Sequence, residues 1–163
     1  MTFMLVLHVL AALLFLGPVT VAVSTFAPYA LQAAAGNSGA LSVAMMLHRI
    51  SRLYGYMSVL VPVLGLGIMF TETSFFKDGK FHASMLLSVI AWVLLLVVIV
   101  PTQKKMLTSL GMSADDLDKG TAPAGATAVD VDTTTVTKQK KKLSMMGGIF
   151  SLLWVIVAVL MVI

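Results

Sequence analysis

Long runs of apolar residues, interrupted by short polar segments, dominate the chain. A helix that crosses a bilayer needs roughly 20 predominantly apolar residues, and four segments have this character. They cover residues 3–27, 53–70, 82–100 and 143–163. None of these four segments contains Asp, Glu, Lys or Arg. The pattern predicts an all-α, polytopic membrane protein in which residues 1–163 form one domain of four transmembrane helices.

The composition favours the same class of protein. Of the 163 residues, 59% are hydrophobic and 11% are charged, whereas a soluble domain carries about 25% charged residues. These values exclude a water-soluble single-core protein and a disordered chain. The absence of cysteine excludes disulfides, thiolate metal sites and a cysteine nucleophile. No basic residue precedes Arg49, so we expect the first apolar segment to be a retained helix and not a signal peptide.

The basic residues predict the orientation of the four helices. Nine of them lie between the first and second or between the third and fourth apolar segments, and only Lys77 and Lys80 lie between the second and third. The positive-inside rule then places both termini outside the cell and the 102–142 loop in the cytoplasm of a bacterium, with the helices in its plasma membrane. We expect seven juxtamembrane cations to anchor helix ends at anionic lipid headgroups: Arg49, Arg52, Lys104, Lys105, Lys140, Lys141 and Lys142.

That distribution explains the net charge of +4 without nucleic acid as a partner, since no aromatic residues are interleaved with the lysines. His48 is expected near the same headgroups, because it precedes Arg49 directly.

Polar and small residues predict where the helices begin and end. Ser38 is a candidate N-cap for a helix that starts near Ala40, and Gly111 is a candidate stop for the third long helix. Ser113 is followed by acidic residues, which is typical of a short capped helix. Residues 120–137 are of low complexity and are expected to be flexible in isolation, because they are too small and polar to build a core.

Small residues spaced four apart predict close helix contacts. The pairs are Ser51 with Gly55, Ser84 with Ser88, Ser144 with Gly148, and Gly147 with Ser151. Packing within the chain explains them, and a seam with another subunit is the alternative. Pro18 and Pro62 are expected to distort their helices locally, as packing kinks.

Residues that could carry chemistry are scarce. A proton- or sodium-coupled transporter usually holds an acidic residue or a broken-helix ion site near the membrane midplane, and the apolar segments contain no acid. Nucleophile triads, phosphate loops and paired carboxylates are missing, so we expect neither enzymatic activity nor a cofactor. His8 and His82 are the candidates for cofactor binding, because two imidazoles at the outer ends of different helices could ligate haem or copper. Local hydrogen bonding of both rings is the alternative.

Two stretches resemble a known family. The first is residues 7–12 (LHVLAA), followed by Gly17-Pro18-Val19-Thr20, which resembles the opening of a family of small four-span actinobacterial membrane proteins of unassigned function. The second is residues 47–54 (LHRISRLY), which resembles that family's entry into its second helix. The opening is also similar to copper-resistance D-type membrane proteins, although their further histidine and acidic positions are not recognisable here.

Small four-span proteins of this kind occur as accessory subunits of the actinobacterial respiratory supercomplex, which joins a cytochrome bcc menaquinol oxidoreductase to an aa3-type cytochrome c oxidase. The resemblance therefore implies a non-catalytic accessory or assembly subunit whose partners are other integral membrane subunits. The alternatives are a small haem- or copper-handling membrane protein that uses His8 and His82, and a small permease.

Overall fold

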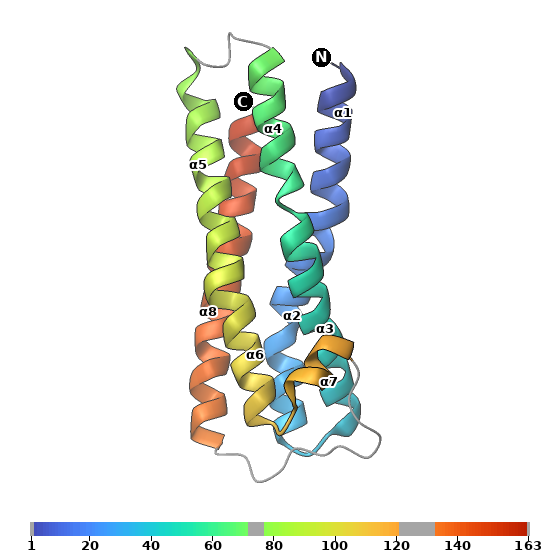
Figure 1. The fold of residues 1–163 in the computed structure, drawn as a ribbon. Helices are drawn as coiled ribbons and strands as arrows, with labels where there is room; N and C mark the ends of the chain where they lie inside the picture. The colour runs from blue at the N-terminus through green and yellow to red at the C-terminus, as the bar shows by residue number, and fades with distance from the viewer. Residues whose placement is uncertain (1, 72–76, 121–132, 163) are drawn as a thin grey trace.

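The computed structural model describes residues 2–71, 77–120 and 133–162. Throughout this described part the regular structure is helical, and Figure 1 shows four long helical columns side by side, with both chain ends at the same end of the bundle. The first two columns are α1 (Thr2–Ala11), η1 (Ala12–Leu16) and α2 (Gly17–Ala34), then α3 (Ser38–Met57) and α4 (Leu60–Thr71). The others are α5 (Gly79–Val93), η3 (Leu94–Ile99) and α6 (Val100–Ser109), then α8 (Thr133–Val162), with the short α7 (Ala114–Lys119) between α6 and α8.

Within the described residues, four helices are long and apolar enough to cross a membrane, and the helical structure confirms the predicted all-α fold class. Their bounds are Phe3–Ala34, Ser38–Thr71, Gly79–Ser109 and Val136–Met161. Each helix extends past the apolar segment that predicted it, at the end of the bundle where α7 lies (Figure 1). The chain is therefore a four-helix bundle whose polar extensions gather at one end.

The start of α3 corrects one prediction. Asn37, and not Ser38, is the N-cap, and its Oδ1 atom accepts a hydrogen bond from the backbone N–H of Ala40 at 3.0 Å. Asn37 has the extended backbone that an N-cap requires, while Ser38 is already helical. The predicted stop at Gly111 is confirmed, because this glycine follows α6 with a φ of +89°.

The start of α8 corrects another prediction. Residues 133–137 belong to the helix and are not a flexible linker. Val136 is fully buried in the core, and it lies with Leu31 and Ala34 of α2 around a small cavity. The apolar contact at this one position gives the polar start of α8 a surface to pack on. The remaining part of the predicted linker, residues 121–132, lies outside the described residues.

Local irregularities accompany three prolines, as expected for Pro18 and Pro62. The π-helical turn η1 ends directly before Gly17 and Pro18, and η3 ends directly before Val100 and Pro101. The break between α3 and α4 falls at residues 58–59, just ahead of Pro62. Proline lacks an N–H and clashes with the carbonyl four residues earlier, and a widened turn or a break relieves both problems.

The small-residue pairs divide between the core and the surface. Ser51, Gly55, Ser84 and Ser88 are buried. A Cβ atom on Gly147 would lie 3.1 Å from Cγ1 of Val23, so α8 and α2 approach closely at this residue. Ser144 and Gly148 are exposed. Packing within the chain thus accounts for most of these residues.

A pair of adjacent glycines tests this packing. Gly147→Leu should lower the free energy of unfolding by about 1–3 kcal/mol, because the new side chain overpacks the contact with Val23. Gly148→Leu is the matched control. A Cβ there meets no atom of the described chain within 4 Å, so stability should change by less than about 0.5 kcal/mol. Thermal unfolding in detergent, followed by circular dichroism, measures both; equal destabilisation would contradict the packing.

Candidate functional site

A buried polar network joins α3 to α6 at the α7 end of the bundle. His48 and Gln103 are almost fully buried, and the Nδ1 atom of His48 lies 3.2 Å from Oε1 of Gln103. The amide nitrogen of Gln103 donates to Oγ of Ser51 at 3.3 Å. Because an amide oxygen only accepts, His48 donates from Nδ1. The His48 ring therefore contacts another helix within the chain, while its predicted depth near the headgroups stays a prediction.

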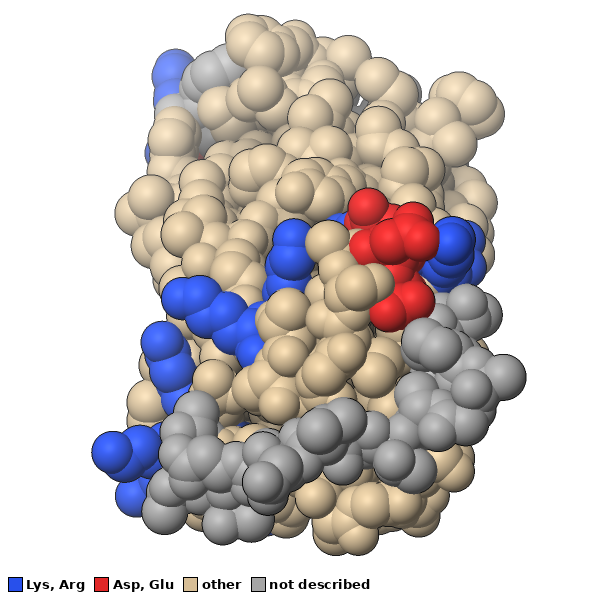
Figure 2. Space-filling model, turned by 60° about the horizontal axis from the view of Figure 1, so that its bottom comes forward, with Lys and Arg blue, Asp and Glu red and all other residues tan. Residues whose placement is uncertain are grey.

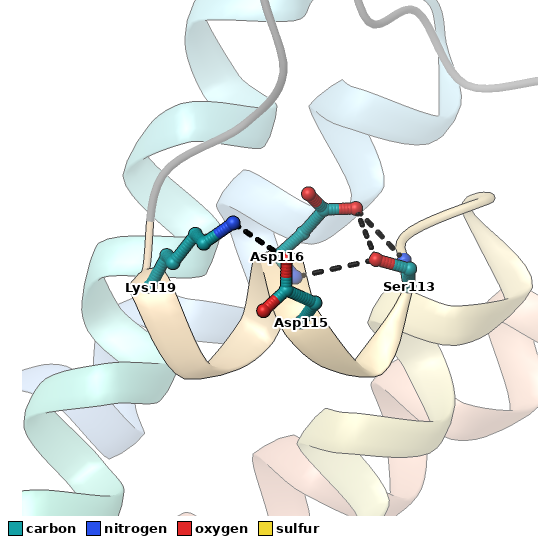
Figure 3. Close-up of polar contacts among 4 residues, drawn as sticks. All are labelled: Ser113, Asp115, Asp116 and Lys119. Atoms are coloured by element: carbon teal, nitrogen blue, oxygen red, sulfur yellow. Dashed lines mark hydrogen bonds and ion pairs between the residues drawn. The ribbon is translucent and has the colours of Figure 1, made fainter.

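The short helix α7 is stabilised by contacts among its own residues and the preceding Ser113, as its sequence predicts (Figure 3). Ser113 and Asp116 form a capping box, in which the serine Oγ accepts from the Asp116 N–H at 3.2 Å and Asp116 accepts from the Ser113 N–H at 3.1 Å. The side-chain and backbone hydrogen bonds from Ser113 hold the pKa of Asp116 below its usual range. Lys119 pairs with Asp115 one turn earlier, at 2.5 Å.

Three contacts fix α7 against α3 and the core. The guanidinium group of Arg52 forms an ion pair with Asp118, and Nη1 of Arg49 donates to the backbone carbonyl of Lys119 at 2.8 Å. Leu117 is buried in the hydrophobic core. The hydrogen bond from Arg52, reinforced by its positive charge, lowers the pKa of Asp118. Arg49 and Arg52 therefore position a helix, a role that sequence reasoning missed.

The C-terminal end of α7 also depends on close packing. Gly120 has a φ of +70° and directly follows α7. A Cβ atom on this residue would collide with the side chain of Arg49. Glycine is therefore required at this position for two reasons, the left-handed backbone and the space taken by the arginine.

The predicted anchoring residues all lie at this end of the bundle. Figure 2 shows the acidic residues of α7 as one patch with lysine and arginine side chains on both sides of it. Lys104, Lys105, Lys141 and Lys142 are exposed, and Lys140 is half-buried. Contact of the seven predicted cations with lipid headgroups stays a prediction, and for Arg49 and Arg52 the structure adds a partner within the chain.

The structure separates the two histidines that were predicted as cofactor candidates. His8 is 7% exposed and lines an apolar cavity of about 290 Å³ near the chain ends. His82 is exposed, does not line that cavity, and has its Nδ1 atom 3.1 Å from the carbonyl of Asp78 on the preceding turn. Among the described residues, no group of three His, Asp or Glu side chains is placed to hold a metal ion. The shared haem or copper site stays a hypothesis, with only His8 in the cavity.

Gly65 makes room for the His8 ring. A Cβ atom at this position would lie 3.3 Å from Cε1 of His8, so the imidazole occupies the space that a side chain would otherwise fill. The cavity and the polar network lie in opposite halves of the bundle, since His8 is in α1 and Gln103 is in α6 (Figure 1).

Comparison with protein families, curated proteins and solved structures finds no match to this chain. The fold alone therefore defines its class, an all-helical protein with four helices able to span a membrane. The resemblance of residues 7–12 and 47–54 to the actinobacterial four-span family stays a prediction.

The docking of α7 can be tested through Asp118. The substitution Asp118→Asn removes the ion pair with Arg52. Residues 113–120 should then exchange their amide hydrogens several-fold faster at pH 7. Asp115→Asn is the matched control, because that carboxylate pairs only within α7. Equal exchange in the two variants would contradict the docking role.

The same ion pair predicts a pH dependence. The pKa of Asp118 is lower in the folded chain than in the unfolded chain, so its contribution to docking is complete above the usual aspartate value of about 3.9. The contribution is lost as the pH falls through the lower, folded-state value. After correction for intrinsic exchange rates, the amide exchange rates of residues 113–120 in the wild-type protein should approach those of Asp118→Asn in that acidic range. Near neutrality the wild-type rates should be lower.

Proposed function

We propose that this protein is a non-catalytic accessory or assembly subunit of a larger membrane complex. The observation that carries the proposal is the docking of α7. A helix of six residues is too short to be stable alone, yet Arg49, Arg52 and Leu117 hold it in one orientation. The result is a fixed, charged surface outside the spans, which is what a partner subunit can recognise.

The orientation in the membrane is part of this proposal. Nine of the eleven lysines and arginines lie in the connections at the α7 end, and the positive-inside rule places that end in the cytoplasm of a bacterial plasma membrane. Both chain ends then face the outside. In this arrangement α7 presents Asp115 and Asp118 to cytoplasmic parts of a partner, while the surrounding lysines attract anionic lipid.

The resemblance of residues 7–12 and 47–54 supports a respiratory partner, namely the actinobacterial cytochrome bcc–aa3 supercomplex. In this proposal the other subunits carry electron transfer. The buried polar side chains of the described residues include no Asp, Glu, Lys or Arg, and several of them serve helix packing. They are His8, His48, Ser51, Ser58, Ser84, Ser88 and Gln103.

The test is recovery of the tagged chain from native actinobacterial membranes in a mild detergent, with partners identified by mass spectrometry. Cytochrome bcc and oxidase subunits should be recovered in stoichiometric amounts. Asp115→Lys should reduce that recovery at least several-fold, because it reverses a charge on the exposed face of α7. Lys77→Asp, a charge reversal at the opposite end, is the control and should leave recovery unchanged.

Other outcomes would overturn parts of the proposal. Stoichiometric recovery of a different membrane complex would retain the accessory role and reject the respiratory assignment. Recovery of the chain alone would reject both, and a Soret band or bound copper in that preparation would support the haem- or copper-handling alternative through His8.

A further inference from the structure

The cavity beside His8 has an unusual combination of apolar walls and two unpaired nitrogen atoms. Side chains from α1, η1, α4, α5 and α8 enclose about 290 Å³, and the described residues that line it include no Asp, Glu, Lys or Arg. A water molecule occupies about 30 Å³ in the liquid, and cavities with apolar walls stay dry. The space is therefore large enough for a two-ring organic molecule and unsuited to a cluster of waters.

Two residues of the cavity wall each carry a buried nitrogen atom that has no hydrogen-bond partner among the described residues. The two atoms are Nδ1 of His8 and Nε1 of Trp154. Trp92, in contrast, donates from Nε1 to the carbonyl of Gly55 at 3.1 Å. Buried polar atoms in native structures are usually paired, because leaving one unpaired loses its hydration without compensation. Two such atoms on residues of one cavity wall point to a partner that is not among the described residues.

The chemistry of the two nitrogens defines that partner. Indole N–H only donates, so Trp154 requires an oxygen that accepts. We take the His8 ring in its neutral form with the proton on Nε2, since Nδ1 is the unpaired nitrogen. A neutral imidazole that donates from Nε2 presents Nδ1 as an acceptor, so His8 requires a donor. A hydroxyl group supplies both functions.

We propose that the cavity binds a neutral, largely apolar alcohol or phenol that enters from the bilayer. Its oxygen accepts from Nε1 of Trp154, its O–H donates to Nδ1 of His8, and its apolar body fills the cavity. An ionised ligand is excluded by the absence of a charged residue among the described residues of the wall. The binding site does not depend on the accessory role proposed above, and either proposal can fail alone.

Three probes of similar shape test the hydroxyl requirement: 2-naphthol, 2-methoxynaphthalene and naphthalene. Their binding to the purified full-length chain in detergent is measured by equilibrium dialysis against empty micelles. 2-Naphthol should bind saturably, at one molecule per chain. It should bind about fivefold more tightly than 2-methoxynaphthalene, whose oxygen accepts a hydrogen bond but cannot donate one. Naphthalene should bind more weakly still. Equal affinities, or uptake no greater than by empty micelles, would overturn the proposal.

Two substitutions separate the roles of the nitrogens. His8→Phe should remove the preference for 2-naphthol over 2-methoxynaphthalene. Trp154→Phe should weaken the binding of both molecules about fivefold and preserve the ratio of their affinities. The matched controls are His82→Phe and Trp92→Phe, which change residues outside the cavity wall and should leave both affinities unchanged.

A measurement on the wild-type chain keeps the proposal testable if a variant fails to fold. In a 15N-histidine NMR spectrum, 2-naphthol should shift the Nδ1 resonance of His8 and leave those of His48 and His82 in place. The methoxy compound should cause a much smaller shift. Equal shifts from both compounds, or no shift from either, would show that His8 does not accept a hydrogen bond from the ligand.

Discussion

The bilayer interior offers no water to pair with backbone N–H and C=O groups, so every spanning segment has to satisfy them internally. This constraint explains both the helices and their irregularities. The π-helical turns before Pro18 and Pro101 occur where a proline removes a backbone donor. Side-chain hydroxyls within the spans follow the same rule, since Thr20 donates to the carbonyl of Leu16 and Thr102 to that of Val98, each one turn earlier.

The two halves of the bundle use their side chains differently. At the α7 end, Phe26 is fully buried and the network of His48 with Gln103 joins two helices. At the other end, the helices enclose a cavity with His8 in its wall. The α7 end therefore holds a charged helix in place, and the opposite end has space beside His8 that we propose is filled by a small molecule.

Much of the fold could be predicted from run lengths and capping residues, because both depend on neighbours in the sequence. The four spans, the stop at Gly111 and the capped helix after Ser113 are local features of this kind. Gln103 was missed because a glutamine beside lysines is typical of a surface. Its spacing from the buried residues Val100 and Met106 places it on the inward face of α6, a signal that was available. The pairing of Arg52 with Asp118 joins residues distant in sequence, and no local pattern reveals it.

A bundle that crosses the membrane four times with its α7 end in the cytoplasm predicts which residues a membrane-impermeant reagent can reach. The chain has no cysteine, so single cysteines can report on each side without background. Asp115→Cys in α7 and Lys77→Cys at the opposite end are treated with a membrane-impermeant maleimide in spheroplasts. Lys77→Cys should react at once, whereas Asp115→Cys should react only after permeabilisation. The reverse pattern would invert the orientation, and labelling of both residues in intact spheroplasts would contradict a bundle that spans the membrane.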